Sequence, residues 1–437
     1  MTPREWVFAL EHFGIKLGLD NIHRILDALD RPHNTWQSVH VAGTNGKGSV
    51  TAMVERGLRA AGHRTGRYTS PHLSRIEERI AVDGVPIDPA EFDRAAGEVL
   101  AVVDRLRTAA ALQTWPTFYE VTTAMAFEIF RRSGVDAAVV EVGLGGRFDA
   151  TNVLIPAVTA ITSIALDHER YLGATLAEIA FEKAGIIKPA TPVVVGTIPD
   201  AARGVIVKQA NAQQAPLVEA GAELVVSSTL TAGRASVVLR TPVAEYERVT
   251  LGLNGAHQVA NAAVAARTLE VCRDQGIAAS SSDILVALSD VDWLVRLEWL
   301  RLRSGGLVLI DAAHNPAGAH ALADYLRAAQ VAPLPIVLAV MQDKDVSGIV
   351  RALAPVASVF VATEIVSARC TRAEELAARI THETPSTPVV IAADSAHAIT
   401  VALDYSARVA VAGSMYLSGP CRAHLIAAGA TSADRPF

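Results

Sequence analysis

Cysteine is scarce in this chain of 437 residues: Cys272, Cys370 and Cys421 lie far apart and form no Cys-x-x-Cys pair. This spacing excludes a disulfide framework and suits a reducing cytoplasm, where we expect the protein to act. The chain also lacks an uninterrupted apolar run of about 18 residues, which would predict a membrane span. Its first residues, MTPREWVFALEHFG, carry acidic side chains and no long apolar core, so we expect no signal peptide.

Positive charge is not in excess either. The formal net charge is −6, which argues against nucleic acid or a membrane surface as a partner. Aromatic residues make up 5% of the chain and hydrophobic residues 51%, so we expect a core built mainly of alanine, valine, leucine and isoleucine. The length is enough for two or three domains.

A glycine-rich segment, GTNGKGS at residues 43–49, stands between a predicted buried strand over 39–41 and a predicted helix over 49–61. Glycines let backbone N–H groups approach an anion closely, and a helix N-terminus adds positive potential. Lys47 supplies a point charge for outer phosphates, and Ser49 supplies a hydroxyl suited to Mg²⁺. The spacer is shorter than in the common P-loop, and the alternative is a glycine-rich turn without a ligand. We favour a phosphate cradle, because the lysine and the hydroxyl have no packing role in such a loop.

Strand and helix patterns alternate through most of the chain, which predicts an α/β fold with a parallel, doubly wound sheet. In the first part we expect strands over 63–69, 136–142, 158–164 and 192–196, a small hairpin over 79–86, and helices over 89–106, 117–133, 176–184 and 254–272. Short antiparallel strands are expected within 222–251. A second α/β unit follows, with strands expected at 307–310, 336–340, 359–363, 388–392 and 408–412. We place the boundary so that the domains are 1–295 and 296–437.

Glu141 is a charged residue in an apolar strand pattern, and a glycine-rich segment, 143–146, follows it. A buried carboxylate needs a cation or hydrogen-bond donors, since leaving it unpaired is costly. One reading is a salt bridge to Arg147. The other is Mg²⁺ binding, with Ser49 and nucleotide phosphates as further ligands.

Four more polar residues follow predicted strands or end a predicted helix: His168, Lys183, Asp311 and His314. Two of them have an ordinary alternative, since His168 could cap local backbone and Lys183 could be a plain helix-terminal lysine paired with Glu178 or Glu182. Their shared location favours one cleft between the domains, because open α/β sheets bind ligands beyond the carboxyl ends of strands. The residues alone therefore predict a Mg²⁺-nucleotide enzyme, with phosphoryl transfer as the natural class of reaction.

Seven motifs carry a more specific resemblance. In chain order they are GTNGKGS (43–49), TSPHL (69–73), EVGLGGRFDATN (141–152), ITSIALDH (161–168), EKAGIIKP (182–189), HQVANAAVA (257–265) and DAAHNP (311–316). Together they resemble bacterial folylpolyglutamate synthase/dihydrofolate synthase, a family within the Mur ligase superfamily. The Mur ligases share GTNGK, whereas the motifs at 141–152 and 182–189 point to the folate branch.

This resemblance implies a P-loop-containing, Mur-ligase-like N-terminal domain and a smaller, Rossmann-like α/β C-terminal domain. It also implies an amide ligase that uses ATP and Mg²⁺: ATP phosphorylates a substrate carboxylate, and the amine of L-glutamate attacks the acyl phosphate. The expected partners are ATP, dihydropteroate or folate, and L-glutamate. We expect a monomer that binds neither nucleic acid nor membrane.

The resemblance further assigns roles to single residues. By similarity, the catalytic set is Lys47, Glu141, His168 and Lys183. One Mg²⁺ would be held by Ser49, Ser70 and Glu141, and a second by Glu141, His168 and a carbamylated Lys183. The nucleotide would be surrounded by Thr44, Asn45, Gly46, Lys47, Gly48, Ser49, Asn261, Arg296 and Asp311. The substrate contacts would be Arg79 and His314 for glutamate, and Tyr119 and Asp149 for the pterin.

Two positions depart from the family pattern. Tyr119 stands where the family often has the second of two phenylalanines, and a tyrosine can still stack on a pterin. Leu294 and Val295 stand where Pro-Gly usually precedes the arginine, so the resemblance leaves the loop shape, and with it the role of Arg296, open.

Two other functions stay in view. A related Mur-type ligase could act on a different carboxylate, but only 38 residues precede Val39, which argues against a separate UDP-binding domain and a cell-wall substrate. A nucleotide-dependent switch would explain the phosphate loop. It would give no reason for Glu141, His168, Lys183 and Asp311 to occur together.

Overall fold

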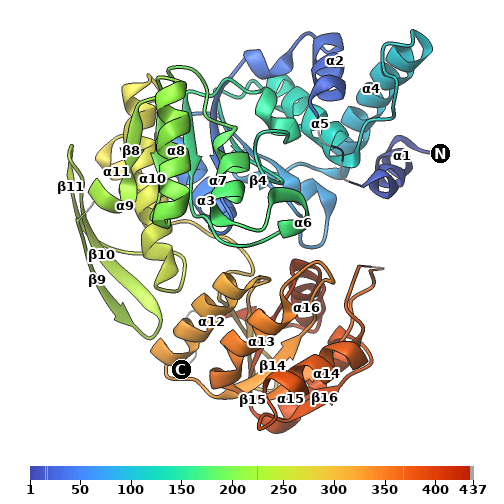
Figure 1. The fold of residues 1–437 in the computed structure, drawn as a ribbon, viewed down its shortest axis with the longest axis vertical. Helices are drawn as coiled ribbons and strands as arrows, with labels where there is room; N and C mark the ends of the chain where they lie inside the picture. Colours follow the sequence, from blue (N-terminus) through green and yellow to red (C-terminus); the bar gives the residue numbers. More distant parts are fainter. Residues whose placement is uncertain (15, 17, 224, 368, 434–437) are drawn as a thin grey trace.

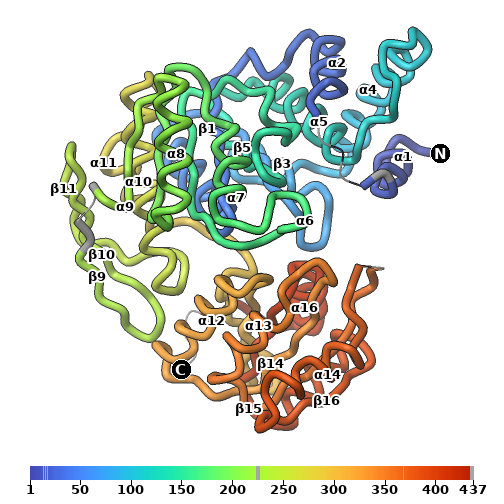
Figure 2. The backbone as a smooth tube through the Cα atoms, in the orientation of Figure 1, coloured from blue at the N-terminus to red at the C-terminus, as the bar shows by residue number. Residues whose placement is uncertain are grey.

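The computed structural model describes residues 1–14, 16, 18–223, 225–367 and 369–433, which form a larger and a smaller α/β unit (Figures 1 and 2). The larger unit is built on an eight-stranded sheet of order β4-β3-β2-β5-β1-β6-β7-β8. Its strands are β1 (Gln37–Ala42), β2 (Thr65–Tyr68), β3 (Ile80–Val82), β4 (Val85–Pro86), β5 (Ala137–Glu141), β6 (Val158–Ile161), β7 (Val193–Val195) and β8 (Leu217–Glu219). The neighbours in β2-β5-β1-β6-β7-β8 pair in parallel, which confirms the predicted parallel sheet. Strand β3 pairs antiparallel with both β2 and β4, and the β3–β4 pair is the predicted hairpin.

Helices cover both faces of this sheet. They are α1 (Pro3–Ala9), α2 (Asp20–Ala28), α3 (Lys47–Ala60), α4 (Pro89–Thr108), α5 (Phe118–Arg132), α6 (Glu169–Leu172), α7 (Leu176–Ala184), α8 (Asp200–Ala212), α9 (Ala220–Glu223), α10 (His257–Asp274) and α11 (Ser281–Ser289). Successive residues of β5 point to opposite faces, so Val139 packs with α3, α10 and α11 while Val140 packs with α4 and α5. Burial on both faces explains why the strands read as continuous apolar runs.

Two local predictions need correction. The helix after the glycine loop begins at Lys47 rather than Ser49, because Gly46 adopts a left-handed conformation with φ 84° and serves as its N-cap. The segment that follows β7 forms α8 and β8, which the sequence reading did not predict. Among the described residues, no helix is long and apolar enough to cross a membrane.

A three-stranded antiparallel sheet, β9 (Val225–Thr231), β10 (Arg234–Arg240) and β11 (Glu245–Thr250), confirms the change of character predicted for 222–251. Figure 1 shows the β9–β10 hairpin reaching toward the smaller unit. At its tip Gly233 lies against the ring of Tyr325, and a Cβ at Gly233 would collide with that ring. The φ of Gly233 is 79°, so both the contact and the turn favour glycine.

The smaller unit has a seven-stranded sheet of order β16-β15-β14-β17-β13-β12-β18. Its strands are β12 (Glu298–Arg301), β13 (Leu307–Ile310), β14 (Leu334–Leu338), β15 (Ala357–Ala362), β16 (Val389–Ile391), β17 (Arg408–Ala412) and β18 (Thr431–Ser432), and its helices are α12 (Pro316–Ala328), α13 (Val346–Leu353), α14 (Ala373–Glu383), α15 (Ser395–Tyr405) and α16 (Met415–Ala427). The five predicted strands are present and parallel. The antiparallel edge strands β12 and β18 were not predicted, because both are short and β12 begins and ends with a charged residue.

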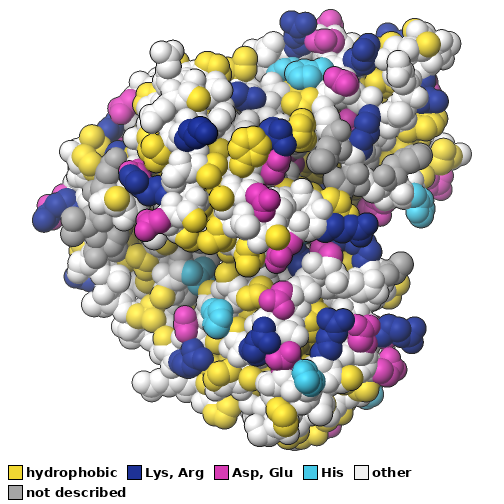
Figure 3. Space-filling model, in the orientation of Figure 1, with side chains coloured by type: hydrophobic (Ala, Val, Ile, Leu, Met, Phe, Trp, Pro, Cys, Tyr) yellow, Lys and Arg dark blue, Asp and Glu magenta, His cyan; other side chains and the backbone are white. Residues whose placement is uncertain are grey.

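The predicted domain boundary between residues 295 and 296 falls in the segment that joins α11 to β12, and it stays a prediction. Over the face in Figure 3, positively and negatively charged side chains are interspersed.

Candidate active site

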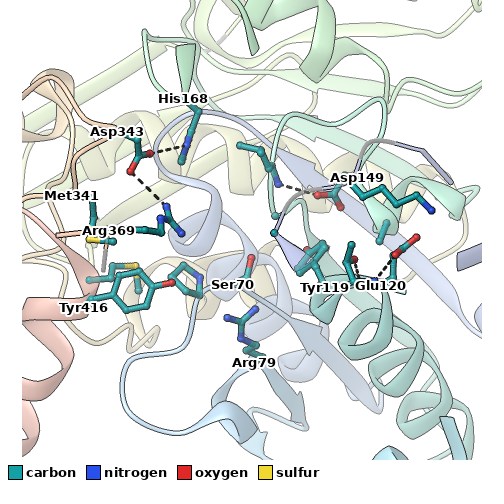
Figure 4. A pocket seen from close by; sticks show the side chains of 18 of the residues that line it. Ser70, Arg79, Tyr119, Glu120, Asp149, His168, Met341, Asp343, Arg369 and Tyr416 are labelled. Carbon is teal, nitrogen blue, oxygen red and sulfur yellow. Dashed lines mark hydrogen bonds and ion pairs between the residues drawn. The ribbon is translucent and has the colours of Figure 1, made fainter. Parts of the chain in front are cut away.

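A cavity of about 360 Å³ lies between the two units, and Figure 4 shows side chains that line it. The larger unit contributes residues that follow β2 and β5, including Ser70 and Asp149. The smaller unit contributes His314 after β13, Lys344 after β14 and Tyr416 in the first turn of α16. Because strand ends of both sheets meet here, the predicted interdomain cleft is present.

The glycine loop is shaped by close contacts as well as by positive φ. Gly43 has a φ of 151° and Gly46 a φ of 84°, and a Cβ at these positions would collide with Thr162 and Asn261, respectively. Lys47 Nζ curls back and donates to Gly43 O at 3.0 Å and to Thr44 O at 3.2 Å. The lysine therefore stands over the loop, where it can reach an anion bound by the loop's N–H groups.

Thr44 and Asn45 hold this loop against the segment that follows β6 and against the second unit. Thr44 N donates to Ser163 O at 2.8 Å, and Asn45 N donates to Ser163 Oγ at 3.0 Å. The Asn45 and Asn315 side-chain amides exchange hydrogen bonds of 3.0 and 3.3 Å across the cleft. Gly48 lies beneath the indole of Trp293, which leaves no room for a larger residue.

Glu141 is buried at the end of β5, and its salt-bridge reading is wrong. Arg147 pairs with Glu182 instead, at 2.6 Å. Glu141 Oε2 accepts a hydrogen bond from Ser70 N at 3.3 Å. Burial raises the pKa of Glu141, and the charge of Lys47 is the strongest of the effects that oppose this rise.

Ser49, Ser70 and Glu141 have the donor chemistry of a Mg²⁺ site, since all three offer oxygen. They come from the start of α3, the segment after β2 and the end of β5, and β1, which leads into α3, lies beside β5 in the sheet. The described residues hold no group of three or more His, Cys, Asp or Glu suited to a metal ion. A metal at this edge would have one protein carboxylate, Glu141, and would take its other ligands from the two hydroxyls and from phosphate oxygens. The first metal set stays a prediction.

Lys183 is buried and does not pair with Glu178 or Glu182, so that alternative is wrong. Its Nζ donates to Gly43 O at 3.0 Å. Glu178 instead forms a capping box with Thr175. Burial, followed by the charge of Lys47, lowers the pKa of Lys183 to about 7.

His168 has a φ of 51° and its side chain caps no backbone group, so the capping alternative is also wrong. Its Nε2 lies 3.1 Å from Lys344 Nζ, and its Nδ1 lies 3.5 Å from a carboxylate oxygen of Asp343. Burial lowers the pKa of His168 to about 4, so the imidazole is neutral at pH 7 and can present a lone pair to Lys344. In this conformation the Lys344 amine lies beside His168 Nε2. That imidazole is one of the ligands predicted for the second Mg²⁺.

Asp167 connects the two units, although sequence reasoning did not select it. Its carboxylate accepts hydrogen bonds from Lys344 Nζ at 2.6 Å and Asn315 Nδ2 at 3.1 Å, and His314 Nε2 lies 3.4 Å away. Burial alone would raise the pKa of Asp167, but His314 and Lys344 outweigh it and hold that pKa far below its ordinary range. The sequence signal that could have selected Asp167 was its position directly before His168, beyond the end of a strand.

Sequence reasoning also missed Asp343, Lys344 and Arg369. The first two follow β14 closely, in the same kind of position that singled out Asp311 and His314. Arg369 lies 3.5 Å from Asp343 and is mostly exposed to the cavity side (Figure 4).

The predicted pterin residues line the same cavity. The rings of Tyr119 and Tyr68 are stacked with their centroids 5.9 Å apart. Asp149 is buried, and its carboxylate accepts hydrogen bonds from Leu144 N at 2.9 Å and Thr151 N at 3.0 Å. Arg79, which was predicted to bind glutamate, also lines this cavity, and its Nε donates a hydrogen bond to His72 Nδ1 at 3.0 Å.

The residues predicted to surround the nucleotide lie on both sides of the domain connection. Asn261 contacts the loop at Gly46, while the Asp311 carboxylate accepts hydrogen bonds from the Leu297 and Ala313 N–H groups at 2.9 and 2.8 Å. Arg296 donates to Val295 O at 3.1 Å. Leu297 has a φ of 51° and Val295 a φ of 52°. Val295 is therefore a β-branched residue in a backbone conformation that favours glycine. This is the position where the family pattern has glycine.

Comparison with known proteins identifies the family. The Mur ligase middle domain matches residues 41–269, and the Mur ligase glutamate ligase domain matches residues 295–415. The dihydrofolate synthase/folylpolyglutamate synthase of Mycobacterium tuberculosis is 40% identical over 82% of this chain and 76% of its own. The Bacillus subtilis protein of the same name is 35% identical over 81% of this chain and 82% of its own.

The chain belongs to the dihydrofolate synthase/folylpolyglutamate synthase branch of the Mur ligases. Members of this branch are ATP-dependent ligases, and the Mur ligase fold of the chain is confirmed by solved structures. M. tuberculosis folylpolyglutamate synthase complexed with ADP matches with a TM-score of 0.89 and 35% identity over 97% of this chain and 99% of that one. E. coli FolC in complex with DHPP and ADP matches with a TM-score of 0.86 and 27% identity over 98% of both chains.

Replacing Lys47 by alanine is expected to lower the turnover of this ligase by roughly 100-fold or more, because charge that develops on a transferring phosphoryl group loses its cation. The two hydrogen bonds to the loop are also lost, at a cost to stability of about 1 kcal/mol each. Steady-state kinetics and thermal unfolding measure both effects, with the exposed Lys208→Ala as control. Turnover of Lys47→Ala equal to that of the control would rule out the phosphate role.

Glu141→Gln is expected to keep the fold and to raise the Mg²⁺ concentration for half-maximal rate by about 10-fold or more, because an amide oxygen is a poorer ligand for a hard dication. Mg²⁺ titrations of the variant, the wild type and the surface control Glu245→Gln test this. If all three curves superimpose, Glu141 has a structural role only.

Proposed function

We propose that this ligase adds L-glutamate to dihydropteroate, to reduced folates, or to both, with ATP as the phosphoryl donor. The observation that carries the proposal is a single cavity that joins an aromatic wall at Tyr119, Ser70 in the segment after β2, and the cations Lys344 and Arg369. Such a cavity suits a flat ring with a carboxylate tail, and its cations suit an amino acid with two carboxylates. Relatives named for folate substrates support this choice over a Mur-type ligase with a different carboxylate.

In the first step, the phosphates of ATP lie on the loop N–H groups and Lys47. An oxygen of the substrate carboxylate attacks the γ-phosphorus, the bond to the β-phosphate oxygen breaks, and ADP leaves. The product is an acyl phosphate. Asn261, Arg296 and Asp311 surround the nucleotide in this proposal, with the domain boundary at 295/296 between them.

In the second step, the neutral amine of glutamate attacks the acyl carbon. The tetrahedral intermediate loses a proton from nitrogen, its C–O bond to the phosphate oxygen breaks, and phosphate leaves with the amide formed. Lys344, Arg79 and Arg369 offer positive charge to the glutamate carboxylates, and His314 lies beside them. Asp167 positions Lys344 and His314 by the contacts already described.

Mg²⁺ is the metal we assign to Ser49, Ser70 and Glu141, where it would neutralise charge on the phosphate oxygens. The second set, Glu141, His168 and Lys183, requires carbamylation of the lysine and withdrawal of Lys344 from His168. We further propose that the enzyme acts as a cytoplasmic monomer, without nucleic acid or membrane.

The decisive experiment follows ADP release with Mg²⁺-ATP, glutamate and a choice of carboxylates. Turnover that needs both glutamate and dihydropteroate establishes dihydrofolate synthase activity, and turnover with tetrahydrofolate establishes folylpolyglutamate synthase activity. Omitting glutamate should remove sustained turnover in either case. A purified, folded enzyme that turns over with neither folate substrate would contradict the proposal.

Lys183 is expected to carry a carbamate. Because burial lowers its pKa to about 7, a substantial share of the Lys183 amine is neutral at pH 7, whereas an ordinary lysine is almost fully protonated. The neutral form reacts with CO₂, and its population grows as the pH rises through 7. Reaction replaces a buried cation by an oxygen ligand group that Mg²⁺ prefers.

Carbon-13 NMR of enzyme equilibrated with labelled bicarbonate measures the modification. We expect a carbamate signal in the wild type and in Lys188→Ala, and its loss in Lys183→Ala together with activity. A metal-loaded, bicarbonate-equilibrated enzyme with no carbamate signal would show that Lys183 acts as an unmodified lysine.

A further inference from the structure

His40 is a histidine buried in the middle of the larger sheet, and none of the roles described above uses it. It lies on β1, between β5 and β6, and has no exposed surface. Its neighbours along the strand, Val39 and Val41, are equally buried and apolar. An apolar side chain would fill this place without the cost of burying a polar ring, so the imidazole calls for an explanation.

A chain of hydrogen bonds leads from His40 to the cavity between the units. His40 Nε2 and Thr151 Oγ1 are 2.7 Å apart, and both side chains are fully buried. Thr151 Oγ1 is also bonded to Asp149 Oδ1, which accepts a second hydrogen bond from Thr151 N at 3.0 Å. Asp149 lines the cavity on the same side as Tyr119 (Figure 4). The chain therefore joins the middle of the sheet to a residue predicted to contact the pterin.

The donors and acceptors of this chain follow from counting protons. An ionised carboxylate only accepts hydrogen bonds, so the single hydroxyl proton of Thr151 is donated to Asp149. His40 must then donate from Nε2 to the Thr151 oxygen. Burial lowers the pKa of His40 to about 3, so the ring is neutral and carries one N–H only. The unprotonated nitrogen is Nδ1, which has no hydrogen-bond partner among the described residues.

These contacts hold the Asp149 carboxylate in one orientation at the cavity wall. Leu144 N donates to its Oδ2, and the Thr151 N–H and hydroxyl donate to its Oδ1. Burial raises the pKa of Asp149, and these donors oppose that rise because they favour the ionised form. If His40 were an acceptor at Nε2, it would compete with Asp149 for the Thr151 proton. An ionised, fixed carboxylate suits the pyrimidine edge of a pterin, where a ring N–H lies beside an amino group.

We propose that His40 is a positioning residue for pterin recognition: its Nε2–H directs the Thr151 hydroxyl to Asp149, so that Asp149 meets the pterin as an oriented acceptor. This inference rests on the proposed function, because it takes a pterin as the ligand of Asp149. The chain ends at Asp149, so its loss acts on the binding of the pterin substrate and leaves ATP and glutamate unaffected.

Two pairs of variants break the chain or preserve it. Thr151→Val removes the hydroxyl and nearly keeps the volume, whereas Thr151→Ser keeps the hydroxyl. His40→Met removes the ring N–H, whereas His40→Gln keeps an N–H at a similar reach. The matched control is Thr159→Val, because Thr159 is buried beside His40 in the sheet and its hydroxyl donates to Ile186 O instead of Asp149. Thermal unfolding checks that each variant is folded.

Binding is measured by calorimetric titration of ADP-loaded enzyme with the pterin substrate that the wild type turns over, dihydropteroate or tetrahydrofolate. We expect Thr151→Val and His40→Met to bind it about 10-fold more weakly, the size of effect for losing one hydrogen bond to a charged group. In steady-state kinetics the KM for this substrate should rise, while kcat and the KM values for ATP and glutamate stay unchanged.

Thr151→Ser, His40→Gln and Thr159→Val should bind the pterin substrate as the wild type does. In a Thr151→Val background, His40→Met should weaken binding no further, because the chain is already broken.

The inference is overturned if folded Thr151→Val binds the pterin substrate as tightly as the wild type, or if Thr159→Val weakens binding equally. Equal weakening by His40→Gln and His40→Met would also overturn it, as would a loss of kcat with an unchanged KM. Failure of the proposed function is distinguishable, because it would appear in the wild type itself as absent binding and turnover of every folate substrate. That result would refute both proposals.

Discussion

The rest of this site depends on one buried carboxylate, Glu141. It lies at the end of a central parallel strand, and no basic side chain is bonded to it. Glu141 is almost fully covered, and Arg147, the cation nearest to it in sequence, is committed to Glu182. Desolvation therefore works against its ionised form, and Lys47 and a backbone N–H only partly offset that effect. A divalent cation with phosphate oxygens is the partner that would satisfy the carboxylate, and the glycine loop beside β5 is where those phosphates would lie.

The candidate site at this edge of the larger sheet also includes residues of the smaller unit. Asp167 receives Lys344, His314 and Asn315 from the smaller unit, so its charge acts as an anchor between the domains. Lys344 also lies against His168, which places an ammonium where a metal-ligating nitrogen is expected. If His168 is a metal ligand as proposed, Lys344 has to leave it before the second metal set can be filled. The site is assembled from two sheets because neither sheet alone carries both the phosphate loop and these cations.

The sequence was sufficient for what depends on local pattern. Strand–glycine–helix order located the phosphate loop, and position beyond strand ends brought His168 and His314 to one cleft. The sequence pattern could not reveal pairs of residues that are far apart in the chain. Arg147 pairs with Glu182 rather than Glu141 because the fold brings Glu182 close to it. Lys344 escaped attention for the same reason, since its contacts lie in the other domain.

The central claim is that the site activates a substrate carboxylate by transferring a phosphoryl group to it. Dihydropteroate with a heavy oxygen isotope in its carboxylate tests this directly, by mass spectrometry of the phosphate released during turnover with ATP and glutamate. The account predicts one labelled oxygen in each phosphate, because the carboxylate oxygen that attacks the γ-phosphorus leaves with it when the amide forms. Unlabelled phosphate, with amide product still formed, would contradict an acyl phosphate and the arrangement of residues built around it.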